Sequence, residues 1–145
     1  MRLWFLIVAS LLVLTACMAP RPPSTVVQVG NMTYPSQMKV GGTNTIKLTL
    51  ENKGSRTPNE IIVSVNHEFW DGFNLNSTEP PLTRQSQPGE GVMRNLRFPG
   101  LPPGQTQEYQ ISITAKKAGE YRLSGGIKAD LEDVSPFSGR SVVNP

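Results

Sequence analysis

Residues 45–50 read TIKLTL, and residues 109–114 read YQISIT. In both stretches apolar and polar side chains alternate along the chain. Successive side chains of a β-strand point to opposite faces of a sheet, so this alternation is typical of strands with one buried face. We therefore expect one set of side chains in a core: Ile46, Leu48, Leu50, Ile111 and Ile113. Lys47, Thr49 and Ser112 are expected on the less buried face.

Four further runs have the same character, and turn residues separate them. The runs lie at residues 25–29, 61–65, 93–98 and 121–127. Most of the 13 glycines and 13 prolines lie between the runs, as in Gly41-Gly42 and Pro102-Pro103-Gly104, which argues against any long amphipathic helix. About seven short strands in one domain of this size predict an all-β fold, an immunoglobulin-like antiparallel β-sandwich.

The N-terminus has the three parts of an export signal. Arg2 precedes an apolar run at residues 3–14, and small residues follow just before Cys17. The run is about a dozen residues, whereas a helix needs roughly 20 to span a membrane. Leu14-Thr15-Ala16-Cys17 resembles the bacterial lipobox. That resemblance implies diacylglycerol on the Cys17 sulfur and cleavage between Ala16 and Cys17.

The alternative is an ordinary signal peptide followed by a chance cysteine. Cys17 is the single cysteine of the chain, so it has no intramolecular disulfide partner. An odd cysteine in an exported protein calls for an explanation, and lipidation supplies one. Two or more acyl chains, such as palmitate, anchor a protein stably. We therefore expect a tethered protein on the extracytoplasmic side of the cell membrane or the outer membrane.

This interpretation divides the chain into three parts. Residues 1–16 are the signal peptide, residues 17–24 are the lipidated cysteine with a spacer, and residues 25–145 are the sandwich domain. Three prolines within residues 20–23 favour an extended polyproline conformation, so the spacer is short and stiff. The formal net charge is +3 and falls to about +2 when Arg2 is removed. The basic residues are scattered along the sequence, which argues against a nucleic-acid partner.

Three stretches carry a family resemblance. They are VGGTNTIKLTLENKG at residues 40–54, FPGLPPGQTQEYQISI at residues 98–113 and AKKAGEY at residues 115–121. In this order they resemble bacterial immunoglobulin-like domains of the CARDB kind, the cell-adhesion-related domains found in bacteria, over residues 37–131. The resemblance implies a sandwich fold and a role as a stalk, an adaptor or a binding module.

Reactive groups are scarce in this sequence. His67 is the single histidine, no G-x-S-x-G motif is present, and the one thiol is assigned to lipid. Nucleophilic catalysis requires a base beside the nucleophile, and zinc sites require several His or Cys ligands. We therefore expect no enzyme activity, no cofactor and no metal, with His67 a solvated loop residue. An enzyme would require His67 to be buried against an acid in a cleft.

Two groups of oxygen ligands leave calcium open as an alternative. The first is Asp71, Asn74, Asn76 and Glu79, and the second is Asp130, Glu132 and Asp133. Calcium prefers clustered oxygen ligands, but neither group has the spacing of a calcium-binding loop.

The aromatic segment Phe69-Trp70-Asp71-Gly72-Phe73 has two interpretations. Phe69 and Phe73 have i, i+4 spacing and suit a plug at the sandwich edge, with Trp70 left exposed. Alternatively, Phe69, Trp70, Asp71 and Phe73 form a binding site in which exposed rings stack on a sugar. The sequence thus predicts a membrane-anchored lipoprotein with a binding or scaffolding domain, whose partner is an envelope protein or a polysaccharide. The alternative is a carbohydrate-binding lipoprotein that uses the aromatic segment.

Overall fold

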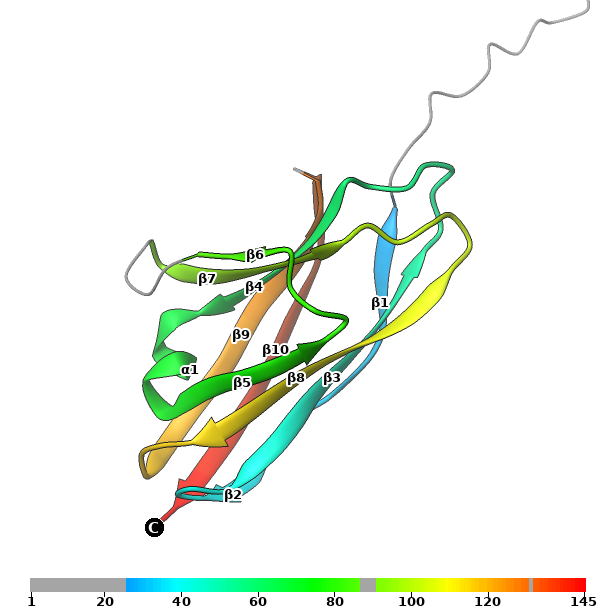
Figure 1. Ribbon diagram of the computed structural model, residues 1–145. Coiled ribbons are helices and arrows are strands. Elements are labelled where there is room, and N and C mark those ends of the chain that lie inside the picture. The colour runs from blue at the N-terminus through cyan, green and yellow to red at the C-terminus, as the bar shows by residue number, and fades with distance from the viewer. Residues whose placement is uncertain (1–25, 87–90, 131) are drawn as a thin grey trace, which may run out of the picture.

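A computed structural model describes residues 26–86, 91–130 and 132–145. The expected signal peptide, Cys17 and the spacer lie outside the described residues. Two β-sheets pack face to face and enclose the core between them (Figure 1). The prediction of an all-β, immunoglobulin-like sandwich is therefore confirmed. In the described part of the chain, no helix is long and apolar enough to cross a membrane.

One sheet has four strands, which are antiparallel throughout. In sheet order they are β1 (Val27–Thr33), β3 (Thr43–Asn52), β8 (Thr106–Ala115) and β5 (Phe73–Glu79). The two stretches with the clearest alternation are the central strands β3 and β8, and they pair with Ile46 opposite Ile111. Ile46, Leu48, Leu50, Ile111 and Ile113 are all buried, as expected, while Lys47 is exposed.

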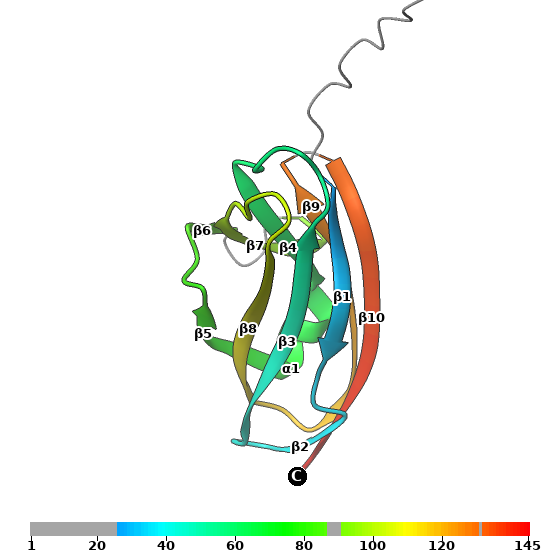
Figure 2. The same ribbon diagram turned by 90° about the vertical axis from the view of Figure 1, so that its right-hand side faces the viewer.

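The second sheet has six strands, and a short helix connects it to the first. In sheet order the strands are β2 (Gln37–Lys39), β10 (Glu132–Asn144), β9 (Gly119–Ala129), β4 (Glu60–Asn66), β7 (Met93–Pro99) and β6 (Arg84–Gln85). β2 and β10 are parallel, and the other pairs are antiparallel. Helix α1 (His67–Gly72) carries the chain from β4 to β5, and so from one sheet to the other (Figure 2).

The described residues contain ten strands, more than the seven or so expected. Six of them correspond to the runs located in the sequence, and the other four are β2, β5, β6 and β10. β10 was missed because Pro136 and Gly139 resemble turn residues. Along most of its length β10 pairs with β9 alone, so it is an edge strand there, and proline is tolerated where no neighbour needs its N–H.

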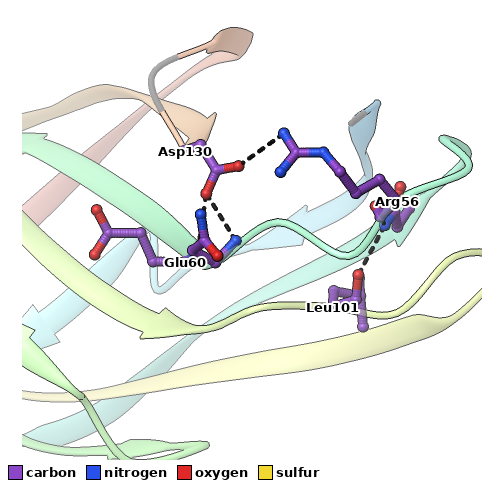
Figure 3. Close-up of polar contacts among 6 residues, drawn as sticks. Arg56, Glu60, Leu101 and Asp130 are labelled. Atoms are coloured by element: carbon purple, nitrogen blue, oxygen red, sulfur yellow. Dashed lines mark hydrogen bonds and ion pairs between the residues drawn. The ribbon is translucent and has the colours of Figure 1, made fainter. Parts of the chain in front are cut away.

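The two ends of the sandwich differ. β1 begins at the end that carries the 53–59 and 100–105 loops, and the C-terminus lies at the opposite end (Figures 1 and 2). At the first end Asp130 clamps the loop before β4. Its carboxylate accepts hydrogen bonds from Arg56 Nη2 at 3.1 Å and from the backbone N–H groups of Asn59 at 2.7 Å and Glu60 at 3.3 Å (Figure 3).

Candidate functional site

The aromatic segment belongs to the core. Helix α1 places Phe69 and Phe73 on the same side, where their rings stack with centroids 4.5 Å apart. The Trp70 ring meets Phe69 edge-on at 5.3 Å and is only 6% exposed. This corrects the expectation of an exposed Trp70. The rings of Phe69, Trp70 and Phe73 are buried. Of the four proposed binding residues, only Asp71 is exposed.

A cation completes this cluster. The Arg94 guanidinium carbon lies 4.8 Å from the centroid of the Trp70 ring, within range of a cation–π interaction. Arg94 Nη2 also donates to Gln85 Oε1 at 2.9 Å. Burial lowers the pKa of Arg94 from its ordinary value. Arg94 thus closes the core at the edge between β5 and β6 and is occupied by internal contacts.

His67 differs from the solvated loop histidine that we expected. It is the first residue of α1, it is half-buried, and its backbone N–H donates to Val92 O at 3.2 Å. Its Nε2 atom is buried and has no hydrogen-bond partner among the described residues. A catalytic triad requires a hydrogen bond between the base and its nucleophile or acid. Such a bond is not formed at Nε2.

Two of the possible calcium ligands, Asp130 and Asn76, are engaged in hydrogen bonds within the domain. Asp130 binds Arg56 and two backbone N–H groups, and the Asn76 amide donates to the hydroxyls of Ser112 and Thr114. Among the described residues, no group of three or more His, Cys, Asp or Glu side chains is placed to hold a metal ion. The side chain of Asp133 lies outside the described part.

The outer face of the six-stranded sheet carries a shallow groove. Register places Ser64 of β4 opposite Asn95 of β7 and Gly126 of β9, and Gly126 opposite Pro136 of β10. These positions alternate with core residues such as Val63 and Ile127, so they face outward. They form a hollow of about 490 Å³, whose lining also includes Met93 and Lys128.

A second hollow extends the first one along β9 and β10. It measures about 350 Å³, shares Pro136 with the first hollow and includes Arg122, Ser124 and Ser138. We call the two hollows together the β9 groove. It arises because short side chains occupy the outward positions of β4, β9 and β10.

Two adjacent glycines in β9 have different roles. A Cβ at Gly125 would lie 1.9 Å from Ser64 O and 2.7 Å from the Phe137 ring, so Gly125 lets β4 and Phe137 approach β9. A Cβ at Gly126 would meet Ser135 O at 3.6 Å, an ordinary contact. A side chain at position 126 would therefore enter the groove without a clash.

Little in the sequence indicates the β9 groove. Gly125-Gly126 resembles turn residues, although it lies inside the expected run at residues 121–127. The outward residues of β4, β7, β9 and β10 are up to about 70 positions apart, and only strand register brings them together. Short polar side chains at alternate strand positions were the available signal, and that signal is common on any sheet surface.

No protein-family model matches the sequence, and no curated protein matches it either. Solved structures show a similar fold. One is the third cohesin of ScaC from Acetivibrio cellulolyticus, solved in complex with the ScaB dockerin. Its sequence is 11% identical to this chain and the TM-score is 0.53. The match covers 84% of this chain and 100% of the cohesin. AvmM, which catalyses macrocyclization in alchivemycin A biosynthesis, is 10% identical with a TM-score of 0.52, over 83% of this chain and 89% of that one.

The CARDB domain of the PF1109 protein from Pyrococcus furiosus is also similar. It is 14% identical with a TM-score of 0.49, over 84% of this chain and 89% of that one. At such identities the likeness concerns the fold alone. A fold shared by a dockerin-bound module and by a macrocyclization enzyme does not choose between binding and catalysis. The function of this chain must therefore be argued from its own surface.

Proposed function

We propose that this chain is a lipid-anchored, extracytoplasmic binding or scaffolding domain of the CARDB-like kind, without catalytic activity. Its partner is an envelope protein, which it holds on the outer face of the six-stranded sheet. The observation that carries this proposal is the β9 groove, a hollow surface of short side chains on a rigid sheet. A similar fold serves protein binding in the ScaC cohesin, which was solved with its dockerin.

The proposed anchor is compatible with this surface. The lipobox at Leu14-Thr15-Ala16-Cys17 supports attachment to a membrane through Cys17. β1 begins at one end of the sandwich, while the outer face of the six-stranded sheet runs along its length (Figure 1). A tether that enters at the end of a sandwich leaves its sheet faces accessible. Stacking on a sugar has less support, since Phe69, Trp70 and Phe73 are core residues.

The anchor is tested by cell fractionation and mass spectrometry. We expect the wild-type protein in the membrane fraction with a diacylglyceryl group on Cys17. Cys17→Ala should accumulate as an unprocessed precursor or leave the membrane fraction. A wild-type protein that is recovered in water-soluble form, with an unmodified Cys17 thiol, would refute the anchor.

The binding face is tested by blocking the groove. Gly126→Val places a side chain in the β9 groove, and Gly30→Val is its matched control on β1, where a Cβ would also lie 3.6 Å from a backbone oxygen, that of Thr49. Affinity capture from solubilised envelopes should recover a partner with the wild type and with Gly30→Val, but not with Gly126→Val. Equal recovery with all three proteins would contradict the assignment of the face.

A further inference from the structure

The outer face of the six-stranded sheet contains two pairs of directly opposed arginines. Arg84 of β6 is opposite Arg97 of β7, and Arg122 of β9 is opposite Arg140 of β10. Directly opposed residues of an antiparallel pair lie on the same face, with Cβ atoms about 5 Å apart. The first pair lies on the outer face because Arg97 stands between core residues Leu96 and Phe98 along β7. The second pair does so because Arg122 alternates with core residue Leu123.

In each pair one glutamate forms an ion pair with one of the two guanidinium groups, and Glu68 lines the same hollow as Arg122 and Arg140. Arg97 forms an ion pair with Glu60, and Arg140 Nε lies 2.9 Å from Glu120 Oε1. Arg84 and Arg122 are exposed, and within the described residues no hydrogen bond or ion pair engages the guanidinium of either one. Each pair therefore offers one arginine that is ready to bind an anion.

This arrangement is unfavourable for the isolated domain. Like charges directly opposite each other in a sheet are destabilising, and the surface has two such pairs. Among the neighbouring outward positions, Ser64, Ser124, Gly126 and Ser138 are neutral, and Lys128 is basic. The stability of the sandwich thus gives no reason for the second arginine of either pair, whereas an anionic partner would.

We propose that the β9 groove and the adjoining sheet surface as far as β6 receive an extended acidic segment of the partner protein, with Arg122 in the groove and Arg84 on β6 as the residues that bind its carboxylates. This inference rests on the proposed binding face. The guanidinium group presents donors in a fork that matches a carboxylate and can hold it through two parallel hydrogen bonds. The apolar lining supplied by Met93 and Pro136 accommodates the uncharged side chains between the acidic ones.

The surface favours a polypeptide over a sugar polymer. Sugar faces stack on aromatic rings, but the outward positions of β4, β7 and β9 carry no aromatic side chain in the described residues. The rings near this face belong to the core or to its margin, as Phe137 does. Phe137 lines the second hollow of the β9 groove, but its ring is partly buried against the core. A shallow groove beside exposed arginines suits a chain that supplies carboxylates and small side chains.

The spacing of the two arginine pairs sets the length of the segment. Three strand spacings of about 4.8 Å separate β6 from β9. Arg84, Arg97, Ile62 and Lys128 lie in one row across the sheet, and Arg122 lies six residues from Lys128 along β9. With about 3.3 Å per residue, Arg84 and Arg122 are on the order of 25 Å apart, which an extended peptide of about eight residues spans.

The test uses the full chain in detergent and two labelled ten-residue peptides. One peptide alternates Glu and Ala, and the other replaces every Glu by Gln. Fluorescence anisotropy should show that the Glu peptide binds and that the Gln peptide does not. The double variant Arg84→Ala/Arg122→Ala should weaken binding of the Glu peptide at least about tenfold, which corresponds to about 1.4 kcal/mol.

A second double variant controls for net charge. Lys116→Ala/Lys117→Ala removes two exposed charges from the loop between β8 and β9, and it should leave the affinity within about twofold of the wild type. Equal weakening by both double variants would mean that total charge, and not this face, attracts the peptide. Equal binding of the Glu and Gln peptides, or no binding of either, would also overturn the proposal.

Two soluble anions distinguish other sources of negative charge. Heparin represents an acidic polysaccharide, and glycerol phosphate represents the headgroup of an anionic lipid. If one of them binds through Arg84 and Arg122 while the Glu peptide does not, the acidic protein segment is refuted. In a further outcome, Gly126→Val abolishes partner capture but the Glu peptide does not compete with the partner. That result would support the binding face and refute the acidic segment.

Discussion

At the scale of single residues, the hydroxyl of Tyr109 is a polar group in an apolar place. Tyr109 is fully buried in the core of the sandwich, its ring meets Phe98 edge-on at 5.0 Å, and its hydroxyl has no hydrogen-bond partner among the described residues. Burial raises the pKa of Tyr109 to about 12 from an ordinary value of 10. The neutral phenol is therefore favoured in the folded state.

This shift predicts a loss of stability at alkaline pH. The unfolded chain releases the Tyr109 proton near pH 10, whereas the folded protein retains it to about pH 12. The contribution to the free energy of unfolding is thus complete below pH 10 and is lost as the pH rises through 12. Between pH 7 and pH 11 the loss should be about 1.4 kcal/mol.

Urea unfolding at both pH values checks this prediction. Tyr109→Phe should remove that part of the alkaline decline, with little change or a small gain in stability at pH 7, because an unpartnered hydroxyl is lost. Tyr34→Phe, at a partly buried tyrosine, is the control and should decline like the wild type. The same alkaline decline in Tyr109→Phe would show that other groups cause it.

Trp70 provides a second prediction for a single residue. Trp70→Ala removes a buried ring with aromatic and cation–π contacts, so the free energy of unfolding should fall by about 3–5 kcal/mol in chemical denaturation. Near-wild-type stability combined with a loss of envelope binding would instead support a surface role. The i, i+4 spacing of Phe69 and Phe73 predicted their core role, but no sequence pattern showed that Arg94 would cover Trp70.

At the scale of elements, sequence patterns were informative where a strand buries one face by strict alternation. β3 and β8 were predicted for this reason, and both are central strands. β5 was missed because FNLNSTE has few apolar residues, and its bulge between Leu75 and Ser77 interrupts the alternation. The β9 groove needed the register of four strands, which no single stretch of sequence contains.

Asp130 supports a prediction about one connection between elements. It adopts a left-handed backbone conformation, with φ of 57°, and ties the loop before β4 to the end of β9. Asp130→Ala should lower the free energy of unfolding by about 1–3 kcal/mol, because three hydrogen bonds are lost and alanine is strained at a positive φ. Asp130→Asn keeps an oxygen acceptor and tolerates this conformation, so thermal and urea unfolding should show a smaller loss. Equal losses in Asp130→Ala and Asp130→Asn would mean that Asp130 stabilises the loop through its negative charge beside Arg56 and not through its hydrogen bonds to the backbone.

At the scale of the whole molecule, the two outer faces of the sandwich differ in character. The outer face of the four-stranded sheet has its polar groups paired with one another, as in Lys47 with Glu108 and Thr43 with Thr114. The outer face of the six-stranded sheet has the β9 groove and two arginines, Arg84 and Arg122, that form no ion pair within the described residues. This difference is the reason that we propose the second face as the binding face.

Site-specific photocrosslinking in intact cells tests this difference most directly. A photoreactive amino acid at Ser138, on the rim of the β9 groove, should give a discrete crosslink to an envelope protein. The same amino acid at Thr45, on the outer face of the four-stranded sheet, should give none. A crosslink from position 45 without one from position 138, or no crosslink from either position, would contradict the binding face.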